Sequence, residues 1–312
     1  MLGNDFIAGF FYLSYSSACF LGVFMTIEAL QKKAAQIRVD SLTAISRAGS
    51  GHSGSSMSCV EILVSLYYGK ISEKYVAKLS PRKPQWEEQD YIILSKGQAV
   101  PTQYAILADL GFFDKSELDF LRKVNSPLQG YPNVKVPGIT VPITSHGCGL
   151  SIATGLAMAL KMDRQPNKVF SILGDGELQE GQVWEAAMCA AHYKLDNLIA
   201  FIDNDDLQMD GPVRSIMDVM PIQDKFEAFG WKVIHVWHGH DFDEILDAIA
   251  KAFTTNRHPV CIWCHTVKGK GIEFAEGKPY YHDVPLSEAE LAEVKKKLDP
   301  VCANNLKMFG NE

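Results

Sequence analysis

The sequence predicts an α/β fold in which a parallel sheet is flanked by helices on both faces. Residues 169–173 form a continuous apolar run that stops at Gly174-Asp175-Gly176, as expected of a strand that is buried on both faces and meets a tight turn. Residues 180–194 carry apolar or small side chains at a helical spacing. Residues 198–202 form a second apolar run. The segment therefore predicts a strand, a turn, a helix and a second strand.

The remaining elements follow from the same patterns. We expect helices at residues 27–48, 59–68, 101–110, 116–123 and 241–253, and a capped, charged helix that begins after Ser287. Further strands are expected at residues 91–94, 231–237 and 259–265. A glycine-rich turn, residues 49–54, follows the first helix and can bring His52 into a cleft.

Length and composition allow a full hydrophobic core. Of the 312 residues, 47% are hydrophobic and 21% charged, which predicts one domain that can carry appended helices. The net charge is −7 and the chain has no dense cluster of Lys and Arg, so we do not expect nucleic acid as a partner. The seven cysteines are scattered, which favours reduced thiols in a cytoplasmic protein over a zinc site.

The first 24 residues differ in character from the rest of the chain. Residues 6–24 are uncharged and just long enough to span a bilayer. No Lys or Arg precedes them, and serines and tyrosines interrupt them, which argues against a signal peptide and against membrane insertion. We expect residues 1–24 to be an extension of unclear role, residues 25–312 to form the functional domain with a C-terminal helical tail, and no membrane as partner.

Polar side chains follow both apolar runs of the central segment. Asp175 comes directly after the first run, and Asp203, Asn204, Asp205 and Asp206 follow the second. The carboxyl ends of parallel strands meet at one edge of a sheet, so these side chains can face each other. Carboxylate, amide and carbonyl oxygens suit Mg²⁺, which keeps water and phosphate oxygens as its other ligands. The segment therefore predicts a site for a metal-bridged diphosphate.

This arrangement resembles the thiamine diphosphate motif, and three further segments narrow the resemblance to the transketolase family. They are Leu-Gln-Met-Asp-Gly at residues 207–211, Ser-Gly-His-Ser-Gly at residues 50–54 and Val-Lys-Gly-Lys-Gly-Ile at residues 267–272. The resemblance covers only the diphosphate-binding half of a complete transketolase. It implies an N-terminal subunit of a split transketolase that uses thiamine diphosphate and Mg²⁺ to transfer a two-carbon ketol unit from a ketose to an aldose.

The resemblance also implies roles for individual residues. The metal ligands would be Asp175, Asp205 and the backbone carbonyl of Leu207, with the neighbouring Asn204 as an alternative to Asp205. His52 and His282 would contact the donor sugar and act in catalysis, and Glu180 would link cofactor sites across a subunit interface. Further contacts are implied to the cofactor for Gln98, Thr144, His146, Gly174, Gly176, Glu180 and His282, and to the substrate for Tyr131.

Several of these positions depart from the usual pattern of the family. Histidine is usual at Gln98 and Tyr131, glycine at Thr144 and leucine at His146. Asp205 stands in place of asparagine, so the site has one more negative charge, which should weaken diphosphate binding unless a cation compensates. Neutral drift and an altered donor or acceptor both remain open as explanations.

The resemblance implies a partner, because the glutamate that activates thiamine belongs to the other half of a complete transketolase. We expect a C-terminal, pyrimidine-binding transketolase subunit in an α₂β₂ assembly, acting on small sugars such as sugar phosphates. Two alternatives remain. The chain could belong to another thiamine diphosphate enzyme, such as a 2-oxo acid dehydrogenase or a relative of deoxyxylulose-phosphate synthase, or it could be a non-catalytic scaffold with a degenerate site.

Overall fold

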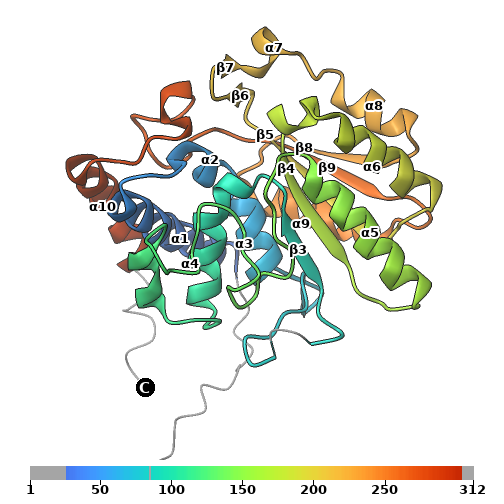
Figure 1. The fold of residues 1–312 in the computed structure, drawn as a ribbon, viewed down its shortest axis with the longest axis horizontal. Helices are drawn as coiled ribbons and strands as arrows, with labels where there is room; N and C mark the ends of the chain where they lie inside the picture. Colours follow the sequence, from blue (N-terminus) through green and yellow to red (C-terminus); the bar gives the residue numbers. More distant parts are fainter. Residues whose placement is uncertain (1–25, 84–85, 304–312) are drawn as a thin grey trace, which may run out of the picture.

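The structure is a computed structural model that describes residues 26–83 and 86–303. Its centre is a five-stranded parallel sheet with strand order β3-β4-β5-β9-β8, and helices cover both faces (Figure 1). The strands are β3 (Tyr91–Leu94), β4 (Val169–Gly174), β5 (Leu198–Asn204), β8 (Lys232–Val236) and β9 (Val260–His265). The predicted fold class is confirmed.

The helices form one layer on each face of the sheet. One layer contains α1 (Ile27–Ala48), α3 (Val60–Tyr68), α4 (Val100–Asp109) and α9 (Phe242–Thr254), and α10 (Glu288–Ala303) packs on α1. The other layer contains α5 (Cys148–Met162), α6 (Gly181–His192) and α8 (Ile222–Ala228). The smaller elements are α2 (Ser53–Ser58), α7 (Val213–Ile216), the hairpin β1 (Lys70–Ile71) and β2 (Lys74–Tyr75), and the hairpin β6 (Leu207–Gln208) and β7 (Gly211–Pro212).

Alternate residues of the central strands enter two separate hydrophobic cores. In β4, Phe170 and Ile172 belong to the core beneath α1, α3, α4 and α9, whereas Val169 and Leu173 belong to the core beneath α5 and α6. All four side chains are fully buried. Since both faces of the strand are covered, the apolar run has no polar alternation.

The crossover from β4 through α6 to β5 positions the functional edge of the sheet. β4 and β5 pair in parallel, with Gly174 opposite Asp203, and the backbone N–H of Asp175 donates to the carbonyl of Asp203 at 3.2 Å. Both strands therefore end at the same edge, and the loops that follow them lie side by side.

Three segments differ from the prediction in the structure. Residues 53–54, expected in a turn, begin the short helix α2. Two residues before α2 lies Gly51, whose φ of 144° few other residues can adopt. The helix expected at residues 116–123 is a 3₁₀ helix at Lys115–Phe120, capped by Asp114. The long helix α5 is absent from the predicted helices; it begins directly after Gly147, which is in the left-handed conformation.

The first predicted helix can be compared with the structure, but the segment before it cannot. Thr26 caps α1 by accepting a hydrogen bond from the backbone N–H of Ala29, and the predicted bounds of this helix are confirmed. The predicted extension, residues 1–24, lies outside the described residues. Within the part of the chain that the structure describes, no helix combines the length and apolar character needed to cross a membrane.

Candidate active site

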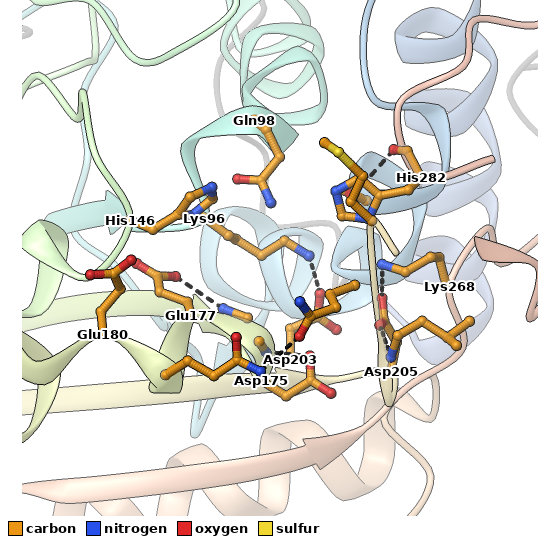
Figure 2. Close-up of a pocket in the computed structure, with 17 residues that line it drawn as sticks. Lys96, Gln98, His146, Asp175, Glu177, Glu180, Asp203, Asp205, Lys268 and His282 are labelled. Carbon is orange, nitrogen blue, oxygen red and sulfur yellow. Dashed lines mark hydrogen bonds and ion pairs between the residues drawn. The ribbon is translucent and has the colours of Figure 1, made fainter. Parts of the chain in front are cut away.

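A cavity of about 250 Å³ lies at the carboxyl edge of the sheet, bordered by the loops after β3, β4, β5 and β9 (Figure 2). Most of the site residues suggested by the sequence converge here from distant parts of the chain, whereas His52, Tyr131 and Thr144 do not line the cavity. Those that line the cavity are Gln98, His146, Gly174, Asp175, Gly176, Glu180, Asp205, Leu207 and His282.

Asp175 and Asp205 lie next to each other in this cavity. The backbone N–H of Asp206 donates to Oδ2 of Asp175 at 2.8 Å, and the N–H of Gly176 donates to Oδ1 at 2.8 Å. Both aspartates are almost completely buried. Burial, followed by the negative charge of Asp205, raises the pKa of Asp175. A proton or a cation must therefore balance part of the charge of this pair.

Two buried lysines supply positive charge to the carboxylates (Figure 2). Nζ of Lys268 lies 2.8 Å from Oδ2 of Asp205, and each side chain is 3% exposed. Lys96 forms an ion pair with Asp203, which also accepts a hydrogen bond from Ser58 at 2.7 Å. Although burial disfavours the carboxylate, Lys96 holds the pKa of Asp203 below its usual range. The extra charge at Asp205 is thus neutralised from within the chain.

Sequence reasoning gave no role to either lysine or to Glu177. Glu177 accepts hydrogen bonds from the backbone N–H of Gly147 at 2.6 Å and of Gly174 at 3.1 Å, and so joins the start of α5 to the end of β4. Burial raises the pKa of its carboxyl group. The available signal was that each lysine precedes a glycine in a loop after a sheet strand, as in Lys96-Gly97 and Lys268-Gly269.

His52 and His282 form a pair at the side of the cavity. Their rings meet edge to face with centroids 5.7 Å apart, and Nδ1 of His282 lies 3.5 Å from the hydroxyl of Ser55. Burial lowers the pKa of His52 to about 4 and the pKa of His282 to about 3. Both imidazoles are therefore neutral at neutral pH, and each can donate one hydrogen bond and accept another.

The positions that depart from the family pattern have different surroundings. Gln98 is buried, and its Oε1 has no hydrogen-bond partner among the described residues. Tyr131 and His146 meet edge to face with ring centroids 6.5 Å apart. Thr144 is exposed and does not line the cavity. Glu180 is exposed at the rim, at the N-cap position of α6.

These residues fit a diphosphate that is bound together with a divalent cation. The described residues contain no group of three or more His, Cys, Asp and Glu side chains that could hold a metal ion, so a cation at Asp175 and Asp205 needs additional oxygens from backbone, water or phosphate. The buried ammonium groups of Lys96 and Lys268 lie nearby and can balance the negative charge of a diphosphate. A Cβ built at Gly174 would meet no atom within 4 Å, which leaves room for a ligand at the end of β4.

Comparisons with known proteins identify relatives of this chain. The family model described as "Transketolase, thiamine diphosphate binding domain" matches residues 29–307. A 6-deoxy-6-sulfo-D-fructose transketolase subunit, SqwG, from a Clostridium species is 40% identical over 273 residues, which are 86% of this chain and 97% of that protein. An apulose-4-phosphate transketolase subunit from Phocaeicola vulgatus is 34% identical over 285 residues, which are 90% of this chain and 99% of that protein.

Longer relatives match along part of their length. The transketolase of Homo sapiens is 40% identical over 264 residues, which are 83% of this chain and 40% of the human protein. The crystal structure of Campylobacter jejuni transketolase superposes with a TM-score of 0.81 at 30% identity and covers 88% of this chain and 43% of that chain. This chain therefore spans less than half the length of that solved structure, but nearly the whole length of the two separate subunits.

Proposed function

The chain belongs to the transketolase family, and we propose that it acts as the N-terminal subunit of a split transketolase. With a partner subunit, it transfers a two-carbon ketol unit from a ketose donor to an aldose acceptor. The observation that carries this proposal is the cavity in which Asp175, Asp205 and two buried lysines lie together. The match to subunits of the same length supports a separate polypeptide.

The cavity is the site for thiamine diphosphate and Mg²⁺. The cofactor supplies the electron sink for cleavage of the carbon–carbon bond. We assign Asp175, Asp205 and the carbonyl of Leu207 as metal ligands. Lys268 and Lys96 balance negative charge around the diphosphate. Because two carboxylates and one carbonyl fill only about half of the octahedral positions of Mg²⁺, the metal and the diphosphate should bind together.

His52 and His282 are the proposed catalytic residues of this subunit. Each imidazole is neutral at neutral pH because burial lowers its pKa, so each can donate one hydrogen bond to a sugar oxygen and accept one from a sugar hydroxyl. Their rings are close enough, with centroids 5.7 Å apart, to contact neighbouring oxygens of one donor molecule. Tyr131 and His146 form the adjoining contact surface, with Gln98 beside it.

We propose that the donor is a ketose with an anionic terminal group. The two subunit relatives are named for a sulfonated ketose and for a sugar phosphate. Gln98, Tyr131 and His146 replace side chains that are usual in the family, and unpaired buried polar groups discriminate strongly between substrates. The assay of choice therefore compares phosphorylated, sulfonated and uncharged ketoses.

The partner is proposed to be the C-terminal, pyrimidine-binding half in an α₂β₂ assembly. The exposure of Glu180 at the cavity rim supports its proposed role at that interface. A cytoplasmic location is proposed as well, because Cys59, Cys261 and Cys264 are buried as free thiols.

The test is co-expression and co-purification of this chain with a C-terminal transketolase subunit, followed by ketol transfer and calorimetry. We expect thiamine diphosphate to bind only when Mg²⁺ is present, and transfer to require both subunits. If thiamine diphosphate fails to bind with or without the partner, the non-catalytic scaffold replaces the enzyme. Binding without ketol transfer to any aldose would favour another thiamine diphosphate enzyme.

A further inference from the structure

A buried network outside the cavity connects distant elements to the loop that carries Lys268. Arg38 on α1 and Glu61 on α3 form a two-pronged ion pair, with nitrogen–oxygen distances of 2.7 and 2.8 Å. Their side chains are 6% and 8% exposed. Oε2 of Glu61 also lies 2.8 Å from Nδ1 of His240, which precedes α9. None of these three residues lines the cavity, and the proposed function gives them no role.

Two hydrogen bonds join this network to the backbone of the loop after β9. The N–H of Val267 donates to Nε2 of His240 at 2.9 Å, and Nε of Arg38 donates to the carbonyl of Lys270 at 2.9 Å. A backbone N–H can only donate, so Nε2 of His240 carries no proton. The proton is on Nδ1, which donates to Glu61. The imidazole is therefore a neutral bridge between a buried carboxylate and the loop.

The charge state of Glu61 suits this arrangement. Burial disfavours its carboxylate, yet Arg38 and the hydrogen bond from His240 hold the pKa of Glu61 at about 2. The carboxylate is thus ionised at neutral pH and is an acceptor for both neighbours. A charge-assisted, two-pronged pair with Arg fixes geometry as well as charge.

The loop after β9 is also confined by its neighbours. The N–H of Gly269 donates to the carbonyl of Gly54 at 3.1 Å, and a Cβ built on Gly54 would lie 3.1 Å from Cγ of Lys268. Gly271 has a φ of 88°, and a Cβ there would lie 2.8 Å from Cδ of Arg38. The backbone that carries the Lys268 side chain is therefore held in place on both sides.

We propose that Arg38, Glu61 and His240 are positioning residues for the cofactor site: they fix the loop after β9 and so hold the Lys268 ammonium against Asp205. They touch neither substrate nor cofactor and act through the loop backbone. The inference rests on the proposed function, because it assigns them an effect on diphosphate binding. When the loop is free to move, part of the binding free energy is used to order it.

The test compares His240→Asn with the matched control His238→Asn in the full chain with its partner subunit. An asparagine at position 240 can still donate to Glu61 but is too short to reach the N–H of Val267. His238 has a 77% exposed side chain that contacts Glu244 at the surface. We expect His240→Asn to raise the Kd for thiamine diphosphate with Mg²⁺ roughly tenfold, or about 1.4 kcal/mol, and His238→Asn to leave it unchanged.

Hydrogen exchange supplies a second readout that general destabilisation would not reproduce. The amide of Val267 should lose protection in His240→Asn, whereas amides of the central strand β5 should keep theirs. A folded His240→Asn variant whose Kd stays within about twofold of the unmodified value overturns the proposal.

A second variant covers the case in which His240→Asn does not fold. Arg38→Lys keeps a positive charge beside Glu61 but lacks the planar fork that also reaches the carbonyl of Lys270, so it too should raise the Kd. If neither variant folds, the network serves folding and the proposal is equally overturned. If the unmodified complex does not bind thiamine diphosphate, the proposed function fails instead.

Discussion

The ion pair between Asp205 and Lys268 offers the sharpest test of the charge balance in the cavity. Its atoms are 2.8 Å apart and each side chain is 3% exposed, so either charge is poorly hydrated if the other is removed. Breaking a buried pair from one side typically costs about 3 kcal/mol or more. We therefore expect Asp205→Asn and Lys268→Met each to lower the free energy of unfolding of the ligand-free chain by about 3 kcal/mol.

The double variant measures the coupling free energy between the two charges, apart from their interactions with the surroundings. With both charges removed, the loss should be smaller than the sum of the single losses by at least about 2 kcal/mol. The assay is urea unfolding of the ligand-free chain. The matched control is the surface pair Asp247 and Lys251, 2.6 Å apart with side chains 62% and 63% exposed, for which the coupling should stay below about 0.5 kcal/mol.

Cofactor binding should distinguish the two single variants, which are expected to lose similar stability without it. Asp205→Asn removes one negative charge from the site and keeps an oxygen for Mg²⁺, so thiamine diphosphate should bind more tightly than to the unmodified chain. Lys268→Met leaves two aspartates facing the diphosphate, so binding should weaken. Additive losses in the double variant, or equal cofactor affinity in both single variants, would refute the view that Lys268 compensates for the acid at position 205.

Three further predictions concern neighbouring features. Asp175→Asn should abolish calorimetric binding of thiamine diphosphate with Mg²⁺ and leave the far-ultraviolet circular dichroism unchanged; retained binding would contradict the assigned ligand. His52 and His282 have pKa values of about 4 and about 3 in the folded state against an ordinary 6.5, so the unfolded state binds more protons and stability falls as the pH drops below 6.5. Their joint replacement by asparagine should flatten this fall in urea unfolding between pH 6.5 and 4, and an unchanged slope would contradict it. Gly149→Ala should cost about 2 kcal/mol, because its Cβ would lie 2.3 Å from the Ser95 hydroxyl, whereas Gly155→Ala in the same helix meets nothing within 4 Å and should be neutral or stabilising in thermal unfolding.

Much of the fold could be predicted because its signals are local. Strands that are covered on both faces have long apolar runs, so β4, β5 and β9 could be located from the order of apolar residues along the chain. The bounds of α1 followed from Thr26 at its start and Gly49 at its end, where a left-handed residue is required. Helix α5 was not predicted. It begins directly after Gly147, within a segment that is otherwise rich in turn-forming residues.

The candidate site was predictable in part for the same reason. Asp175 and Asp205 could be placed together because the rule for parallel strands brings two loop ends to one edge. The partners of these carboxylates could not be predicted. Lys268 lies 63 residues from Asp205 along the chain, and Lys96 lies 107 residues from Asp203, so no local pattern connects them.

The sequence by itself determined the class of fold, the edge of the sheet that carries the chemistry and the aspartates that meet there. These follow from periodicity, chain direction and the few side chains that suit a hard cation. Only the tertiary structure decided how the charges are balanced, which imidazoles stay neutral and what holds the loop of Lys268. Those properties depend on burial and on contacts between distant segments, and the cost of burying a charge is fixed only once its neighbours are in place.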